Sequence, residues 1–135
     1  MDLGLIESDI REWFAGYLSA FTALGRGTST PAEVAEYFFV PLLVTTDDVV
    51  ISLRSSDDVA SWLTVQADGM AAAGYDHTHV SSTDVRVANG TTATVRALMV
   101  RRRKDGSDIS ELSVTYVLVR DQRDLRVHAL LVHSA

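Results

Sequence analysis

Glu111 is the carboxylate whose position most suggests chemistry, because it lies within a β-patterned run and not at a turn or helix cap. Arg101 lies on the preceding run, one hairpin step away and on the same predicted face. An ion pair between them inside a cavity would keep Glu111 ionised, whereas a lone buried Glu111 would have its pKa raised toward general acid–base use. An exposed ion pair near the hairpin tip is the structural alternative. The sequence leaves these possibilities open.

The histidines are the second group with chemical potential. His133 ends the last β-patterned run on the predicted inner face, where it could carry protons or lie at an exposed chain end. His77 and His79 stand two residues apart on one strand, but no clear third ligand accompanies them, so we predict no metal site. Cysteine is absent, which excludes thiolate catalysis, disulfides and cysteine-ligated metals and favours a reducing, cytoplasmic location.

Length and charge limit the classes of partner. The 135 residues are the size of one domain, which we place at residues 1–135. No apolar run approaches the roughly 20 residues needed to cross a bilayer, so no membrane association is expected. The formal net charge of −6 disfavours binding to nucleic acid, and the basic run at 101–104 is interpreted as a solvated hairpin tip.

The first half of the chain has the patterns of helices. Apolar residues at three- and four-residue spacing cover residues 6–24 and predict one amphipathic helix. The capping sequence TPAE at 30–33 predicts a short second helix that reaches about Phe39. The sequence SSDD at 55–58 caps a third helix, which we expect to stop near Gly74.

The second half has the patterns of strands. Two brief runs at 42–46 and 49–53 surround a plausible turn, and four longer runs follow, joined by short turns with Asn-Gly and Asp-Gly signals. The longer runs span residues 75–88, 91–104, 107–120 and 125–133. Helices followed by an antiparallel meander predict an α+β fold, in which three helices pack on a strongly curved antiparallel sheet. The element order is α-α-β-β-α-β-β-β-β, and the expected shape is a cone.

The pairing of these strands predicts two sheet faces. If the last two turns are three-residue loops, paired residues share a face. The predicted inner face includes Met99, Arg101, Glu111, Ser113, Thr115 and His133, and the other face includes Arg96, Leu98, Val114, Tyr116, Leu130 and Val132. Both faces are apolar at their centres, whereas a sheet buried on one side only would alternate apolar and polar residues. We therefore predict a homodimer through the sheet, with helices on the opposite face.

The element order resembles the nuclear transport factor-like superfamily, which includes ketosteroid isomerases, SnoaL-type polyketide cyclases and limonene epoxide hydrolases. The local signs are the sequence WFAGYL at 13–18, Thr30-Pro31 at the second helix, and LRVH at 125–128 in the final hairpin. The resemblance spans almost the whole chain. Members share a cone but not a chemistry, so the resemblance implies a fold and a pocket more than a reaction.

The resemblance to ketosteroid isomerases implies roles for Tyr17 and Asp47. In those enzymes a first-helix tyrosine donates a hydrogen bond to an oxyanion and an early-strand aspartate moves the proton. A second oxyanion donor there is a protonated acid, whereas residues 113–116 of this chain read Ser-Val-Thr-Tyr. Tyr17 as a core aromatic and Asp47 as a turn residue are the alternatives.

A small-ligand pocket with an apolar lining and a few polar anchors is the expected site. The predicted ligand-binding residues are Trp13, Tyr17, Trp62, Tyr75, Met99, Arg101, Ser113 and Thr115, and the candidate catalytic residues are Tyr17, Asp47, Glu111 and His133. We expect a protein that binds a small apolar molecule without a cofactor, with or without isomerase, cyclase or hydrolase chemistry. The alternatives are a noncatalytic dimeric binding or interaction module with a filled cone, and an accessory domain of a larger enzyme or regulator.

Overall fold

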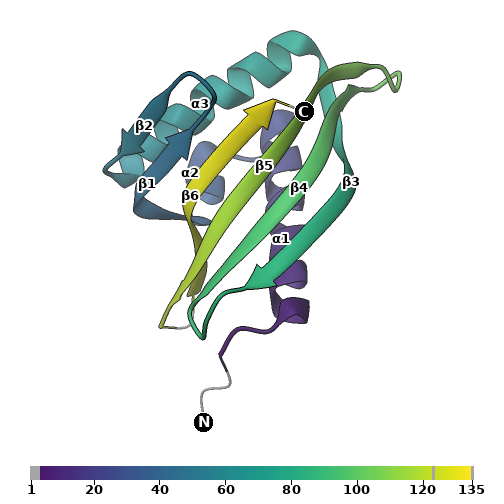
Figure 1. The fold of residues 1–135 in the computed structure, drawn as a ribbon. Helices are drawn as coiled ribbons and strands as arrows, with labels where there is room; N and C mark the ends of the chain where they lie inside the picture. Colours follow the sequence, from purple (N-terminus) through teal and green to yellow (C-terminus); the bar gives the residue numbers. More distant parts are fainter. Residues whose placement is uncertain (1–3, 123, 135) are drawn as a thin grey trace.

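The computed structural model describes residues 4–122 and 124–134. Within them the chain forms helices and strands in the predicted order (Figure 1). The helices are α1 (Glu7–Gly25), α2 (Pro31–Ala35) and α3 (Ser56–Ala73). The strands are β1 (Phe38–Thr45), β2 (Val50–Leu53), β3 (Tyr75–Val87), β4 (Thr92–Arg103), β5 (Asp108–Asp121) and β6 (Asp124–Ser134).

The strands form one sheet in the order β2-β1-β6-β5-β4-β3. Neighbouring strands are antiparallel except β1 and β6, which run parallel, whereas the sequence predicted an antiparallel sheet throughout. Hairpin signals determine only the pairing of strands adjacent in sequence. The pairing of β1 with β6 joins segments separated by most of the chain, so no local signal could indicate its direction.

The helix termini form largely through the predicted capping residues. Thr30 accepts a hydrogen bond from the Glu33 amide at the start of α2, and Ser55 accepts one from the Asp58 amide at the start of α3. Gly74 ends α3 in the left-handed conformation, with φ of 79°, which glycine adopts at little cost. No helix in the described part of the chain is long and apolar enough to cross a membrane.

The predicted extension of α2 to Phe39 is wrong. The helix ends at Ala35, and Phe38 already belongs to β1, where it pairs with Val127 of β6. The Val127 amide donates to the Tyr37 carbonyl at 2.9 Å. Sheet pairing therefore replaces the last predicted helical turn, because it satisfies backbone groups that a solitary short helix would leave to solvent.

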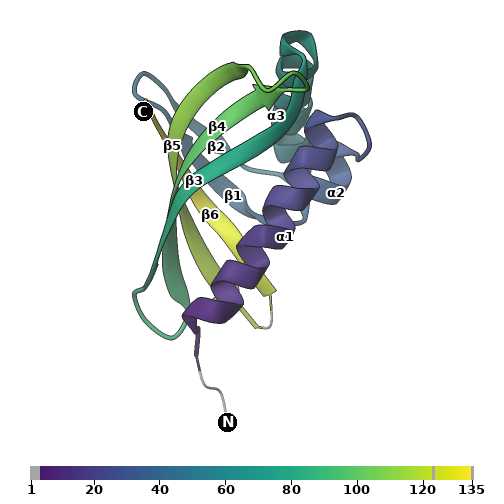
Figure 2. The same ribbon diagram turned by 90° about the vertical axis from the view of Figure 1, so that its right-hand side faces the viewer.

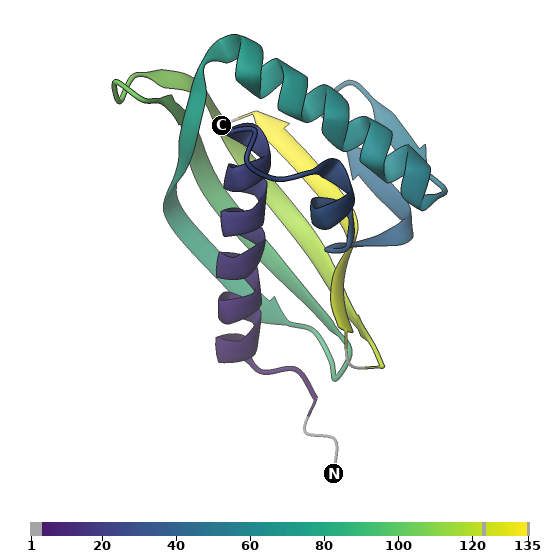
Figure 3. The same ribbon diagram turned by 180° about the vertical axis from the view of Figure 1, so that it is seen from behind.

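All three helices lie on one side of the curved sheet (Figure 2). Seen from behind, α1 and α3 cross in front of its concave face (Figure 3). The apolar stripe of α1, with Ile10, Phe14 and Tyr17 nearly inaccessible to solvent, packs toward this face in one hydrophobic core. No helix of the described residues lies on the opposite, outer face of the sheet (Figures 2 and 3).

A β-bulge on β5 reverses the predicted faces of β5 and of β6 from Ala129 onward, whereas a second register shift between the pairs Leu118–Val127 and Val117–Ala129 leaves the buried Val127 on its predicted face. At the hairpin tip Arg102 pairs with Asp108, as a three-residue loop requires, but the next pair is Arg101 with Ser110. Ile109 is therefore an extra residue on β5. Since side chains alternate with a period of two, one extra residue exchanges the faces of the positions beyond it as far as the next register shift. The helix-covered face thus carries Ala97 and Met99 of β4 together with Leu112, Val114 and Tyr116 of β5, and Leu130 and Val132 of β6.

Candidate functional site

A cavity of about 250 Å³ lies between α1, α3 and the concave face of the sheet. Most of its lining is apolar, with the phenol groups of two tyrosines, the guanidinium of Arg101 and a few hydroxyl and amide groups added. Its lining residues are Tyr17, Leu18, Phe21, Val44, Thr46, Ile51, Trp62, Gln66, Thr78, Met99, Arg101, Leu112, Val114, Tyr116, Leu130 and Val132. This combination of an apolar body and a few polar anchors is typical of small-ligand sites.

A larger groove of about 1090 Å³ lies on the far side of α1, against α2 and the β5–β6 tip. Its lining is mainly polar and includes Asp9, Glu33, Arg120 and Arg126. An open polar groove leaves a ligand solvated, whereas the smaller cavity removes apolar surface from water. We therefore take the smaller cavity as the candidate site.

Tyr17 occupies the centre of an aromatic cluster beneath the cavity. Its ring stacks on Trp13 at 5.7 Å between centroids and meets the edge of Tyr116 at 5.4 Å. Phe14, Phe21, Tyr37 and Phe38 also contact this ring, with centroids at 5.7–6.1 Å. These contacts hold the Tyr17 ring in place, and the residue lines the cavity although it is only 2% exposed.

The Tyr17 and Tyr116 hydroxyls interact with each other in this buried setting. Burial raises the pKa of Tyr17 well above its ordinary value, and the Tyr116 hydroxyl raises it further, while Arg101 acts in the opposite direction. Burial also raises the pKa of Tyr116, against the lowering effects of Tyr17 and Arg101. Both phenols therefore stay protonated at neutral pH and are able to donate hydrogen bonds.

Arg101 projects from β4 into the same cavity. Its guanidinium carbon lies 5.8 Å from the centroid of the Phe21 ring, a distance at which a cation and an aromatic face attract each other. Its positive charge is close enough to both tyrosines to offset part of the rise in their pKa values that burial causes. Arg101 is the cationic residue of the described cavity lining.

The structure brings together four of the residues predicted from sequence. Tyr17, Trp62, Met99 and Arg101 all line the cavity. Trp62 comes from α3, and its ring meets Phe38 edge-on at 6.1 Å. Helix and strand periodicity therefore identified residues from three separate elements of the site.

Four other predicted residues lie on the outer face of the sheet because of the bulge at Ile109. Glu111 pairs with Val100 and is exposed, so the predicted ion pair with Arg101 does not form. Ser113 and Thr115 follow it on the same face, and Ser113 pairs with His133 of β6, which is exposed. The prediction that these side chains point into the cone is wrong.

Asp47, Trp13 and Tyr75 lie near the cavity but outside its lining. Asp47 is exposed in the β1–β2 turn, next to the lining residue Thr46. Trp13 borders the larger polar groove. The turn position of Asp47 corresponds to the structural alternative given for it.

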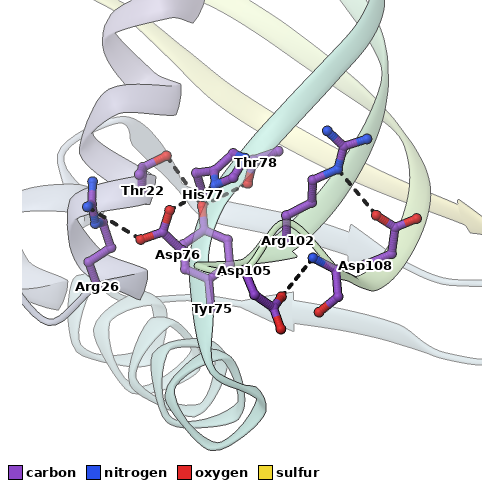
Figure 4. A network of polar contacts seen from close by, with 10 residues as sticks. Thr22, Arg26, Tyr75, Asp76, His77, Thr78, Arg102, Asp105 and Asp108 are labelled. Atoms are coloured by element: carbon purple, nitrogen blue, oxygen red, sulfur yellow. Dashed lines mark hydrogen bonds and ion pairs between the residues drawn. The ribbon is translucent and has the colours of Figure 1, made fainter.

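Tyr75 links the start of β3 to the end of α1 through a hydrogen bond. Its hydroxyl is hydrogen-bonded to Thr78 at 2.8 Å and donates to Thr22 at 3.3 Å (Figure 4). Beside it Arg26 pairs with Asp76 at 3.5 Å, and Asp76 lies 2.8 Å from the His77 ring nitrogen. Within the described residues no group of three potential metal-binding side chains is present, and His77 is occupied by this carboxylate contact.

Sequence reasoning missed Tyr116 as a site residue. It was predicted to lie on the outer face with Val114, and both line the cavity. Gln66 and Thr78 were also missed as lining residues. A tyrosine between apolar residues of a central strand was the available signal, but the face on which it lies depends on the bulge at Ile109.

The curved sheet, the covering helices and the enclosed cavity define an NTF2-like protein. The model of the family described as "NTF2-like protein (DUF6841)" matches residues 7–135. The chain belongs to this family. No curated protein matches the sequence.

Solved structures with the same fold are distant in sequence. A domain of unknown function with a cystatin-like fold from Nostoc punctiforme has a TM-score of 0.72 and 16% identity, covering 97% of this chain and 80% of its own. An NTF2-like protein from Novosphingobium aromaticivorans has a TM-score of 0.69 and 16% identity, covering 94% and 80%. A protein from Catenulispora acidiphila in complex with S-DNPA has a TM-score of 0.65 and 14% identity, covering 93% and 90%. At these identities the likeness concerns the fold.

Proposed function

We propose that this protein binds a small apolar molecule in the cavity between α1, α3 and the concave sheet, in the manner of SnoaL-like proteins. The observation that carries this proposal is the mainly apolar cavity of about 250 Å³ with Tyr17 and Tyr116 among its lining residues. A cavity of this size accommodates one- or two-ring compounds, since roughly 150 Å³ suffices for benzene. The relative from Catenulispora acidiphila, which was solved with S-DNPA, supports a ligand-binding use of this fold.

Binding alone, without chemistry, is the simplest function of these residues. Proton abstraction needs a base within hydrogen-bond reach of the reacting atom. The described lining includes no carboxylate or imidazole, and the two phenols are held protonated. If an isomerase-, cyclase- or hydrolase-type reaction occurs here, Tyr17 and Tyr116 would serve as hydrogen-bond donors to an oxygen atom, and Asp47 in the adjacent turn is the carboxylate to test as a base.

Filling the cavity tests the proposed function. In the Val132→Phe variant the larger ring would occupy the cavity, because Val132 lies on its wall. We expect the variant to lose measurable binding of 2-naphthol, a neutral two-ring probe, in ligand-observed NMR. The matched control is Val87→Phe, since Val87 is 43% exposed and lies outside the cavity lining. Equal binding by both variants, or no binding by the unaltered protein, would contradict the proposal.

We also propose that the protein forms a homodimer through the outer face of the sheet. Leu43 and Leu98 on this face are each 40% exposed, and Leu131 lies between them on the central strand β6. The face also carries Arg96 and Glu111, whose opposite charges are compatible with a self-complementary two-fold interface. A dimeric binding module that does not use the cavity remains the second candidate function, and it is favoured by this exposed apolar surface.

A further inference from the structure

Arg101 differs from its neighbours on β4 in having no polar partner. Arg102 donates to Asp108 at 3.2 Å (Figure 4), and Arg103 donates to the Ala73 carbonyl at 2.9 Å. For Arg101 no hydrogen bond or ion pair is found among the described residues, and its charge rests against the Phe21 ring. The carboxylate predicted to neutralise it, Glu111, lies on the opposite face of the sheet.

A guanidinium presents five N–H donors in a planar fork and cannot lose its proton in a protein. Arg101 is partly buried beside apolar side chains, and such a group gains most from an anion or acceptors that complete its shell. Within the described lining, the acceptors available are hydroxyl and amide oxygens, such as those of Gln66 and Thr78. These acceptors are neutral, so a negatively charged group on a ligand would complement the guanidinium of Arg101 better than the cavity lining does.

The two tyrosine hydroxyls add further hydrogen-bond donors beside Arg101. Tyr17 and Tyr116 remain protonated and border the same cavity as Arg101. The cavity lining thus includes several hydrogen-bond donors, and apart from Thr46, Gln66 and Thr78 its other residues are aliphatic or aromatic. Charge-assisted and bidentate hydrogen bonds from arginine to a carboxylate are stronger than neutral ones. An oxyanion in the cavity would be able to accept hydrogen bonds from Arg101 and from the tyrosine hydroxyls.

We propose that the ligand of the cavity is an apolar carboxylic acid, bound as its anion, with the carboxylate on Arg101 and the phenol donors and its hydrocarbon body against Met99, Leu112 and Val132. This inference rests on the proposed small-molecule function and names the class of ligand for it. The net charge of the chain is −6, so its overall field repels anions. A preference for an acid over a neutral analogue must therefore come from local groups in the cavity.

The test compares two probes of the same size and shape, 2-naphthoate and 2-naphthamide, by isothermal titration calorimetry near neutral pH. The unaltered protein is expected to bind the carboxylate at least about tenfold more tightly than the amide, as one charge-assisted contact implies. Arg101→Gln should remove this preference by weakening naphthoate binding, while its affinity for naphthamide stays the same. Unchanged naphthamide binding also shows that the cavity is intact.

Arg102→Gln is the matched control, because it removes the same charge from the next residue of β4, whose side chain already has Asp108 as partner. It should retain the preference for naphthoate. Equal binding of both probes by the unaltered protein, or a preference that survives in Arg101→Gln, overturns the inference and leaves the proposed function standing. If neither probe binds, the proposed function fails as well. Should Arg101→Gln not fold, the preference of the unaltered protein decides the question by itself.

Discussion

At the scale of single residues, Tyr17 connects the core to the cavity. Its ring contacts six other aromatic rings, and the residue lines the cavity. The same burial that holds the ring in place raises the pKa of its hydroxyl. The same packing therefore holds the ring and keeps its hydroxyl protonated, so the pKa of Tyr17 reports on how tightly this cluster is packed.

The raised pKa values predict that the folded state becomes less stable in alkaline solution. A tyrosine whose folded-state pKa lies above its unfolded value of about 10 contributes its full stabilisation below that pH. As the pH rises toward the folded-state pKa, the unfolded chain loses its proton first, so the free energy of unfolding falls by up to about 1.4 kcal/mol per pH unit for each such residue. Denaturant titrations from about pH 9 to about pH 11 would measure this slope.

The Tyr17→Phe variant should show a shallower fall in stability over this range, since one ionisable group is gone. Tyr116→Phe should have a similar effect, because burial raises the pKa of that hydroxyl too. Curves parallel to that of the unaltered protein would mean that neither phenol is held protonated by the fold.

At the scale of elements, the sequence determined the starts of α2 and α3 and the order of elements along the chain better than it determined sheet faces. The capping residues Thr30 and Ser55 act as predicted because their hydrogen bonds are local. The bulge at Ile109 is decided by packing across the whole sheet, and nothing in the neighbouring residues marks it. Four site candidates beyond it were therefore placed on the wrong face.

The predicted residues that line the cavity come from elements before this bulge. Tyr17 and Trp62 lie on helices whose apolar stripes must face the sheet, and Met99 and Arg101 belong to β4, which precedes the irregularity. Tyr116 was missed because it follows the extra residue. Local periodicity thus locates a side chain on its own element, whereas its face relative to other strands depends on an uninterrupted register.

The close approach of α1 to β3 gives a prediction about glycine. A Cβ atom on Gly25 would lie 2.5 Å from the Cε2 atom of Tyr75, and the hydroxyl of that ring is already hydrogen-bonded. Gly25→Ala is therefore expected to destabilise the protein by about 1–3 kcal/mol, as other overpacked sites do. Chemical denaturation would measure the change.

Gly69 in α3 is the matched control for this substitution, since no atom lies within 4 Å of the corresponding Cβ position. Gly69→Ala should stabilise the protein by roughly 0.5–1 kcal/mol, because alanine loses less backbone entropy in a helix. If both substitutions have the same effect, the contact between α1 and β3 is looser than its distances indicate.

At the scale of the whole molecule, the sheet divides two proposed functions between its faces. The concave face, with Val114 and Leu130, holds the cavity, and the outer face, with Leu98 and Leu131, lies open. Successive residues of one strand alternate between these faces. A substitution on the outer face is therefore able to alter association without touching the cavity.

The homodimer proposal predicts that Leu98→Glu separates the subunits. A buried, unpaired carboxylate at the centre of an apolar interface is costly on both subunits at once, because the two-fold axis repeats it. Sedimentation velocity at micromolar concentration should show a dimer for the unaltered protein and a monomer for Leu98→Glu. Val65→Glu is the matched control: Val65 is 66% exposed on α3, on the helical side of the sheet, and the variant should remain dimeric.

The same variant separates association from ligand binding. Leu98 lies outside the described cavity lining, so monomeric Leu98→Glu should bind 2-naphthol as the dimer does. A monomeric unaltered protein would remove the dimer proposal while leaving the cavity unaffected. Loss of 2-naphthol binding together with the dimer, in a variant that stays folded, would mean that the partner subunit shapes the cavity, and the two faces would then have to be treated as one functional unit.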